Sequence, residues 1–370
     1  MIKSKPKSRG YQPASSIVSM LPNAAIKDGA ELTDIADFTE FGDNSSLSSV
    51  IDCVSFSHFQ RRFLCGASAL RDTRLVSRMQ LYLAMAGLDN TDSLAQLLVA
   101  DIRRYESASA ILLSKKPITI KNLFEAHSKL ELEPRRSGKL RVTEIWIGES
   151  RETASYIAPS PEKVKRLLED FLILLNNQKQ FSIEDVVKHY SQFLAIHPFS
   201  DGNGRMSRIL VEYMQQRSDL KTHLSLFRLG NNISHYQDAV SSFGIKSNLG
   251  MESPYWQSMI AWISEYEAKA TALLQKLEDI FKTKLLLASL NGIDLKVIDL
   301  LLKQPIVSIS TACQALNIDM STAKDSLSKL IDRGILKPFR TKRNPNVELL
   351  VCVDVCQFTM KLDEILFEGK

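Results

Sequence analysis

The twelve residues from 197 to 208, HPFSDGNGRMSR, combine side chains that could bind a polyphosphate and accept a proton. Gly202 and Gly204 permit backbone angles that other residues avoid, so successive N–H groups can face one anion at the start of a helix. Arg205 and Arg208 lie three residues apart on one face of that helix, where two guanidinium groups can grip phosphate oxygens. The pattern therefore predicts a phosphate-binding loop.

Three more side chains in this stretch would complete a phosphoryl-transfer site. Asp201 offers a hard oxygen ligand to a Mg²⁺ ion that bridges phosphates, and Asn203 offers an uncharged hydrogen-bond donor. His197 can accept a proton from an incoming hydroxyl group, because an imidazole with an ordinary pKa of about 6.5 is mostly neutral at pH 7. The alternative is a helix-capping turn with solvated arginines, but a cap needs neither the preceding His-Pro-Phe nor two following arginines.

The stretch resembles the motif of the Fic family, H-P-F-x-D/E-G-N-G/K-R-x-x-R, at every fixed position. The resemblance implies a mainly α-helical Fic-type fold with a β-hairpin flap, and an enzyme that transfers AMP from ATP to a protein hydroxyl. Carried over by position, His197 would deprotonate the target hydroxyl and Asp201 would bind the metal. The other motif residues would hold the phosphates: Arg208 the γ-phosphate, and, for the α- and β-phosphates, Gly202, Asn203, Gly204 and Arg205.

A second resemblance lies downstream of the motif. The segment from 232 to 237, NISHYQ, resembles the family's Asn-Arg-x-x-Tyr-Tyr segment near the adenosine, although it departs from that pattern at Ile233 and Gln237. Asn232 and Tyr236 are therefore the candidates for contacts to the ribose or the adenine.

A strand pair is expected ahead of the motif. Residues 142 to 147 and 154 to 158 read as two strands joined by a turn. Fic proteins place a short target-binding hairpin, the flap, at this distance before the motif, and the resemblance assigns Trp146, Ile147 and Gly148 to it. A strand edge can hold an extended target segment by main-chain hydrogen bonds and so bring a hydroxyl to the catalytic histidine. The alternative is a small structural hairpin.

Many Fic enzymes also carry an inhibitory helix with the pattern Ser/Thr-x-x-x-Glu-Gly/Asn, whose glutamate pairs with the last motif arginine. Two segments approximate this pattern with aspartate in place of glutamate: residues 68–73, with Ser68 and Asp72, and residues 48–53, with Ser48 and Asp52. Asp72 is preferred because it adjoins a helical pattern between residues 59 and 86. The alternative is an ordinary surface aspartate in a helix.

The chain of 370 residues, 44% of them hydrophobic, is long enough for two or three domains with proper cores. We expect an N-terminal arm and helical region with the candidate inhibitory helix at 1–110, a Fic catalytic core at 111–288 and a winged-helix domain at 289–370. Apolar periodicity predicts two helices within 92–130 and further helices at 162–175, at 183–194 and from 255 to about 287. Two histidines outside the motif, His127 and His189, lack the neighbouring ligands of a metal site and are interpreted as packed or surface residues.

The C-terminal region resembles a winged helix-turn-helix domain. Helical runs at 297–302, 311–316 and 322–331 precede two expected strands at 334–336 and 347–353. Between Ser321 and Pro345 seven basic residues oppose two acidic ones, an excess that would suit phosphate contacts on DNA. The presumed recognition helix has no arginine or asparagine near its start to read base edges, so a protein-docking or dimerising domain is the alternative.

Composition favours a cytoplasmic protein that does not bind membranes. The net charge of +5 fits a polyanionic ligand or nucleic acid but requires neither. Five cysteines without zinc-site spacing favour a reducing compartment. No apolar run approaches the ~20 residues of a membrane span, and the basic start of the chain is not followed by the apolar segment of a secretory signal.

The function predicted from the sequence is Mg²⁺-dependent transfer of AMP from ATP to Ser, Thr or Tyr hydroxyls of target proteins and of the chain itself. Removal of AMP, or another phosphodiester transfer at the same site, is one alternative. A DNA-binding regulator whose Fic core only senses nucleotide is the other, although a sensor has no need of the base that His197 provides. The sequence leaves open whether the chain forms a homodimer.

Overall fold

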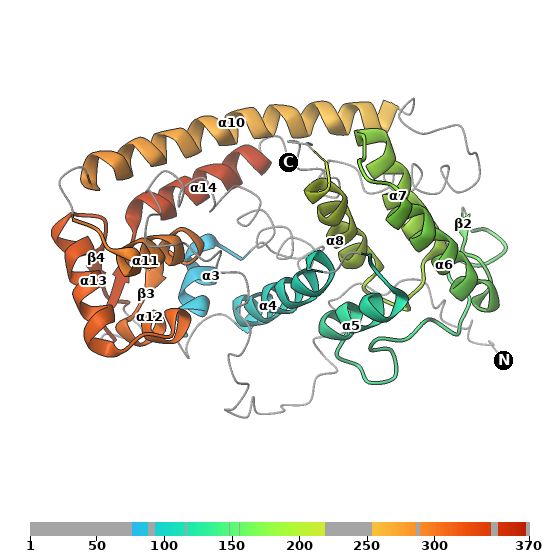
Figure 1. Ribbon diagram of the computed structural model, residues 1–370, viewed down its shortest axis with the longest axis horizontal. Helices are drawn as coiled ribbons and strands as arrows, with labels where there is room; N and C mark the ends of the chain where they lie inside the picture. Colours follow the sequence, from blue (N-terminus) through green and yellow to red (C-terminus); the bar gives the residue numbers. More distant parts are fainter. Residues whose placement is uncertain are drawn as a thin grey trace, which may run out of the picture. The chain divides into compact units, whose positions relative to one another are not determined.

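The computed structural model describes residues 76–87, 93–114, 117–147, 149–154, 156–218, 254–285, 289–341 and 347–367 (Figure 1). The described chain is mainly α-helical, as expected, with two small antiparallel sheets. It divides into two units. Of the described residues, those between 104 and 264 lie in the first, and those between 76 and 103 and from 265 onward lie in the second. Residues 76–103, which the sequence groups with an N-terminal region, thus share a unit with the C-terminal residues.

The first unit contains the motif. Its elements are the second half of α4 (Ser93–Leu113), α5 (Ile120–Leu130), β1 (Trp146–Ile147), β2 (Tyr156–Ile157), α6 (Pro161–Asn177), α7 (Ile183–Ile196), α8 (Asn203–Gln216) and the start of α10 (Pro254–Leu285). Both α7 and α5 begin at a capping box, formed by Ser182 with Asp185 and by Thr119 with Asn122. Their starts are therefore set by local sequence.

Helix α8 is the central helix of this unit. It packs against α7, as Figure 1 shows, and against α5, while α6 covers α7. Its middle is buried on all sides, including Met206, Ile209, Val211 and Tyr213, each with 0% exposure. Such burial marks an interior helix rather than an amphipathic surface helix. The motif loop at its start is therefore attached to the most enclosed element of the unit.

The hairpin is shorter than the sequence predicts. Trp146 pairs with Ile157 and Ile147 pairs with Tyr156, and one more bond joins the Ala158 N–H to the Ile145 carbonyl. Residues 142–144 are not part of a strand. Their backbone instead leaves the hairpin near the end of α7, where the preceding residue, Arg141, donates its N–H to the Pro198 carbonyl.

The second unit ends in a three-stranded sheet flanked by helices. Its elements follow the order α3 (Arg78–Met85), the first half of α4, the second half of α10, α11 (Gly292–Lys303), β3 (Ile306–Val307), α12 (Ile309–Leu316), α13 (Met320–Asp332), β4 (Lys337–Phe339), β5 (Leu349–Val351) and α14 (Val353–Phe367). The strands are antiparallel in the order β3-β5-β4. Buried side chains of α10, α11, α13 and β5 form one continuous apolar core.

Three features of this unit differ from the sequence prediction. The strand expected at 334–336 begins at Lys337, because Gly334 adopts a left-handed φ of 68° and ends α13 in a turn. The strand β3 was not predicted. The expected final strand stops at Val351 and is followed by α14, which carries the buried Cys356. The β-branched residues at the start of α14 resemble a strand, but apolar side chains three and four apart continue beyond them.

Among the helices with described positions, none is both long enough and apolar enough to cross a membrane.

Candidate active site

His197 terminates α7 in an unusual backbone conformation. Its φ of 49° lies in the left-handed region, which among the described non-glycine residues only Asn317 shares. Its ring Nδ1 lies 3.2 Å from the Leu194 carbonyl oxygen. A carbonyl can only accept, so Nδ1 carries the proton and Nε2 keeps a free lone pair. The geometry of the helix end therefore selects the tautomer that a general base requires.

Burial also keeps His197 neutral. Its pKa is lowered from 6.5 to about 4, mainly by desolvation and also by the positive charge of Arg141, while the Leu194 carbonyl and Asp201 act in the opposite direction. The imidazole is consequently unprotonated at pH 7 and can accept a proton.

The loop after His197 is closed by Asn203. The Asn203 side chain accepts a hydrogen bond from the Phe199 N–H at 3.0 Å and donates one to the Phe199 carbonyl at 2.8 Å. Both residues are buried, with exposures of 3% and 0%. The amide of Asn203 thus holds the loop in shape, so a phosphate contact of this residue falls to its backbone N–H.

The start of α8 lacks a side-chain cap. Gly202, with a φ of 80°, is the N-cap residue, and its carbonyl accepts from the N–H groups of Arg205 and Met206. The N–H groups of Asn203 and Gly204 precede these first intrahelical donors. Uncapped N–H groups at the positive end of a helix dipole form a site for an anion.

The two motif arginines have different surroundings. Arg205 donates from Nη1 to the Leu130 carbonyl at 3.1 Å, and its Nη2 lies 3.9 Å from the Asp201 carboxylate. Arg208 is only 2% exposed, and none of its three guanidinium nitrogens has a hydrogen-bond partner among the described residues. A buried cation without a partner is costly, so this guanidinium needs an anion.

The surroundings of Asp201 match the requirements of a Mg²⁺ ion that is bound mostly by phosphate and water. Its side chain is 40% exposed, and its Oδ1 accepts from the Gly202 N–H, which leaves Oδ2 available. No group of three or more His, Cys, Asp and Glu side chains within the described residues could hold a metal by itself. Mg²⁺ is commonly held by one or two carboxylates together with substrate phosphates, so one available carboxylate suffices.

His127 lies under the loop, a role that its sequence position does not reveal. Its ring has 0% exposure and stacks on Phe199, with 3.8 Å between ring centroids and an interplanar angle of 9°. Nδ1 accepts from the Gly138 N–H at 3.1 Å, so Nε2 carries the proton that it donates to the Asp201 carbonyl at 3.0 Å. The expectation of a packed histidine is correct, but the packing is against the motif. A Cβ at Gly202 would lie 3.1 Å from the His127 Nε2, so this position requires glycine for space as well as for its φ.

Arg141 is the second residue that sequence reasoning missed. It is 2% exposed, and its guanidinium donates to the carbonyls of Thr143, Pro159, Ile196 and His197. The carbonyl of His197 lies 56 positions further along the chain, so no local pattern indicates the contact. The only signal is a single arginine directly before the predicted strand.

The described part of the flap consists of β1 and β2. Trp146 is partly buried, and its Nε1 has no hydrogen-bond partner within the described ranges. Tyr156 donates its hydroxyl to the Ala195 carbonyl at 2.6 Å. For Ile147 only the backbone is described, and Gly148 lies outside the described residues.

Two other groups of predicted site residues also lie outside the described residues. They are the proposed adenosine contacts, Asn232 and Tyr236, and the candidate inhibitory residues, Asp52, Ser68 and Asp72.

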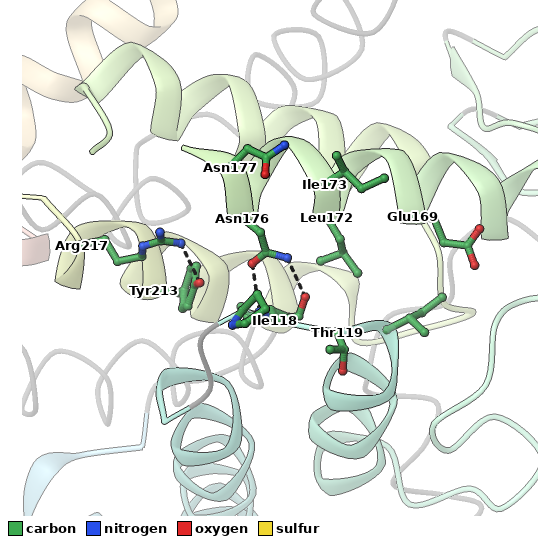
Figure 2. Close-up of a pocket in the computed structure, with 11 residues that line it drawn as sticks. Ile118, Thr119, Glu169, Leu172, Ile173, Asn176, Asn177, Tyr213 and Arg217 are labelled. Carbon is green, nitrogen blue, oxygen red and sulfur yellow. Dashed lines mark hydrogen bonds between the residues drawn. The ribbon is translucent and has the colours of Figure 1, made fainter. Parts of the chain in front are cut away.

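A groove of about 850 Å³ lies at the other end of α8 (Figure 2). Its lining includes Ile118, Leu172 and Asn176, together with Tyr213 and Arg217 from the last turn of α8 and beyond. Tyr213 lies ten positions after Asn203 on α8, which at about 1.5 Å per residue places the groove roughly 15 Å along the helix from the loop. The groove is therefore distinct from the phosphate-binding loop.

The region around the loop is similar to known proteins. Residues 117–215 match the Fic/DOC family. The chain is 32% identical over 115 residues to protein adenylyltransferase fic-1 of Caenorhabditis elegans, covering 29% of this chain and 21% of the relative. It is 33% identical over 117 residues to protein adenylyltransferase Fic of Culex quinquefasciatus, covering 30% and 22%. The chain thus spans less than a quarter of the length of these relatives.

Solved structures of Fic proteins are also similar to the chain. A Fic family protein from Desulfovibrio desulfuricans G20 aligns with a TM-score of 0.43 and 16% identity over 83% of this chain and 94% of that one. A structure of Fic-1 from C. elegans aligns with a TM-score of 0.35 and 19% identity, covering 61% and 74%.

Proposed function

We propose that the chain, whose residues 117–215 match the Fic/DOC family, transfers AMP from ATP to a hydroxyl side chain of a protein. The observation that carries the proposal is the arrangement around α8: an uncapped helix start, a neutral His197 at the adjoining helix end, and the buried Arg208, whose guanidinium has no hydrogen-bond partner among the described residues. The relatives that match this region are named protein adenylyltransferases, which supports the same activity.

His197 would act as the general base. Its Nε2 accepts the proton of the target hydroxyl while the hydroxyl oxygen attacks the α-phosphorus of ATP. A new oxygen–phosphorus bond forms, the bond from the α-phosphorus to the bridging oxygen breaks, and pyrophosphate leaves with its electron pair. The tautomer held by the Leu194 carbonyl keeps Nε2 available for this proton.

The phosphates would lie over the start of α8. The N–H groups of Asn203 and Gly204 face the α- and β-phosphates, Arg205 adds charge at the edge of the loop, and Arg208 binds the γ-phosphate. When bound, a Mg²⁺ ion would neutralise phosphate charge. Asp201 would be its protein ligand, through the carboxylate oxygen that the Gly202 N–H leaves available.

The same proposal includes the residues that the sequence assigns around the nucleotide. Asn232 and Tyr236 contact the adenosine, and an edge of the flap at Trp146, Ile147 and Gly148 holds the target segment. The helix with Ser68 and Asp72 would restrain the enzyme through the last motif arginine, and Asp52 is the alternative residue for this role. The free thiols of Cys313, Cys352 and Cys356 favour a reducing compartment, here the cytoplasm.

For the second unit we propose a winged helix. The order α11, β3, α12, α13, β4, β5 and the sheet order β3-β5-β4 support this interpretation, with α13 as the recognition helix. DNA is its candidate partner because of the local excess of basic residues, and homodimer formation is the alternative. Binding of the full chain to duplex DNA that weakens steeply with salt would support the first use.

The proposed reaction is tested with ATP labelled at either the α- or the γ-phosphate. Label from the α position should appear in protein, and His197→Ala should reduce it by at least about 100-fold, because a general base contributes that much. His189→Gln is the matched control, because His189 is also buried on α7 but lies two turns earlier. Stronger labelling in Asp72→Ala would support the inhibitory role.

Other outcomes would replace the proposal. Transfer of the γ-label would indicate a kinase-like reaction. Release of AMP from a modified protein, without its attachment, would indicate the reverse activity. Nucleotide binding without any transfer would favour the sensing regulator.

A further inference from the structure

The flap region donates hydrogen bonds to the last two carbonyls of α7 and to the carbonyls of the two residues that follow it. A helix end leaves its final carbonyls without intrahelical donors, and here four consecutive ones must be satisfied. Ala195 accepts from the Tyr156 hydroxyl at 2.6 Å, and Ile196 accepts from Arg141 Nη2 at 3.3 Å. His197 accepts from Arg141 Nε at 2.7 Å, and Pro198 accepts from the Arg141 backbone N–H at 3.0 Å.

The same guanidinium also binds both ends of the hairpin. Arg141 Nη1 donates to the Thr143 carbonyl at 3.0 Å, just before β1, and Nη2 donates to the Pro159 carbonyl, just after β2. Thr143 and Pro159 are the points at which the chain enters and leaves the flap. One side chain therefore joins the catalytic helix end to the two ends of the hairpin.

No other residue type fits this position equally well. The guanidinium is planar and offers five donors in fixed directions, and here three of its nitrogens reach four carbonyl oxygens. Lysine has one point of attachment and would satisfy only part of this set. The positive charge also lies at the negative end of the α7 dipole, where it is stabilising.

We propose that Arg141 is a positioning residue that holds the flap and the backbone of the catalytic base as one unit. Tyr156 assists it, since burial raises its pKa to about 12 and the phenol remains a hydrogen-bond donor at any physiological pH. If the flap holds the target segment, Arg141 fixes the distance between the target hydroxyl and Nε2 of His197. This role depends on the proposed AMP transfer and specifies how that reaction is aligned.

If Arg141 has this role, its replacement should affect the alignment of the target hydroxyl with His197 but not the binding of the nucleotide. Arg141 contacts carbonyls of α7 and of the flap, whereas the phosphates would be held by the start of α8 and Arg208. In Arg141→Lys we therefore expect kcat for AMP transfer to fall by about 10- to 100-fold, the loss that a misplacement near 1 Å produces. The KM for ATP should change less than about twofold. Tyr156→Phe removes one of the four caps and should reduce kcat to a smaller extent.

The experiment measures kcat and KM for ATP in self-modification, the affinity for a non-hydrolysable ATP analogue with Mg²⁺, and amide hydrogen exchange of residues 142–147. Arg217→Lys is the matched control, because Arg217 packs over the Phe181 and Tyr213 rings in the same unit but away from the motif. Faster exchange in Arg141→Lys together with a selective loss of kcat supports the proposal.

Three results would overturn it: an unchanged kcat, exchange as slow as in the wild type, or parallel losses of nucleotide affinity and thermal stability. If the wild type transfers no AMP, the proposed function fails instead. The exchange and affinity measurements then still decide whether Arg141 holds the flap to α7.

Discussion

Helix α8 and three helices of the second unit differ in how the N–H groups of their first turns are satisfied. Helices α11, α12 and α13 each begin at a residue whose side chain accepts an N–H of the first turn, namely Asn291, Ser308 and Asp319. Helix α8 begins at Gly202, which has no side chain to do so. A buried charged side chain in each unit, Asp294 in the second and Arg208 in the first, shows a similar difference.

Asp294 of α11 is fully buried and accepts from the Ser326 hydroxyl at 2.6 Å, from Lys329 at 3.0 Å and from the Asn291 N–H at 2.9 Å. Arg208 of α8 is almost as deeply buried and has no hydrogen-bond partner among the described residues. Buried polar groups are normally satisfied, and those that are not need an explanation. The comparison indicates that these polar groups of the second unit serve stability, whereas the start of α8 and Arg208 in the first unit are suited to a ligand.

The largest effect that tests the comparison is expected in the second unit. Asp294→Ala should lower the free energy of unfolding by about 3 kcal/mol, because a hydroxyl and an N–H that now bond a buried carboxylate lose their partner. Urea denaturation measures this change. Asp325→Ala, an exposed aspartate on α13, is the control and should change it by less than about 0.5 kcal/mol. A loss below 1 kcal/mol for Asp294→Ala would show that this network is not a structural one.

A smaller effect on stability, with an added effect on the ligand, is expected at His127. His127→Leu keeps much of the volume but leaves the Asp201 carbonyl and the Gly138 N–H without their partner, at a cost of about 2 kcal/mol. The distorted loop should also bind nucleotide about tenfold more weakly, as titration calorimetry would show.

His189→Leu is the matched control for His127. His189 is a similarly buried histidine that donates from Nδ1 to the Asp185 carbonyl at 2.8 Å and lies between Phe171 and Phe181. Its loss should reduce stability but leave nucleotide affinity unchanged. Equal losses of affinity in both variants would contradict a specific role of His127 under the loop.

The last effect is a dependence of stability on pH that arises from the first unit. Burial lowers the pKa of His127, His189 and His197, the last to about 4. Below about pH 6.5 the unfolded chain therefore binds more protons at these residues than the folded chain, so stability falls as the pH falls toward 4. Each histidine adds at most about 1.4 kcal/mol per pH unit.

Thermal melts at pH 7, 6 and 5 measure this dependence. His127→Gln should show a weaker dependence than the wild type, because it lacks one of the three groups that take up a proton on unfolding. A melting temperature that rises between pH 7 and pH 5 would contradict the assignment.

The sequence predicts the parts of the site that are local. The motif lies on one loop and one helix turn, and apolar periodicity predicts α7 and α8 on its two sides. Loop geometry follows from Gly202, because a left-handed N-cap strongly favours glycine.

What the sequence does not predict depends on distant contacts. The His127 ring reaches the Asp201 carbonyl across 74 positions, and Arg141 reaches His197 across 56. Nothing in the local pattern separates these two residues from an ordinary packed histidine or a surface arginine. The different surroundings of Arg205 and Arg208 were missed for a related reason. Spacing puts both on one helix face, but the Leu130 carbonyl of α5 provides a partner for Arg205.

The most direct test of a ligand site at α8 is to replace the buried guanidinium of Arg208. In Arg208→Met, a buried charge that has no hydrogen-bond partner within the described part of the chain becomes an apolar side chain of similar length. We expect the free energy of unfolding to increase by about 1–4 kcal/mol and the affinity for a non-hydrolysable ATP analogue with Mg²⁺ to fall by about 10- to 100-fold. Calorimetric titration, with denaturation of the same samples, measures both. An unchanged affinity, or a loss of stability on removing this charge, would show that Arg208 serves the fold and that the start of α8 is not the phosphate site.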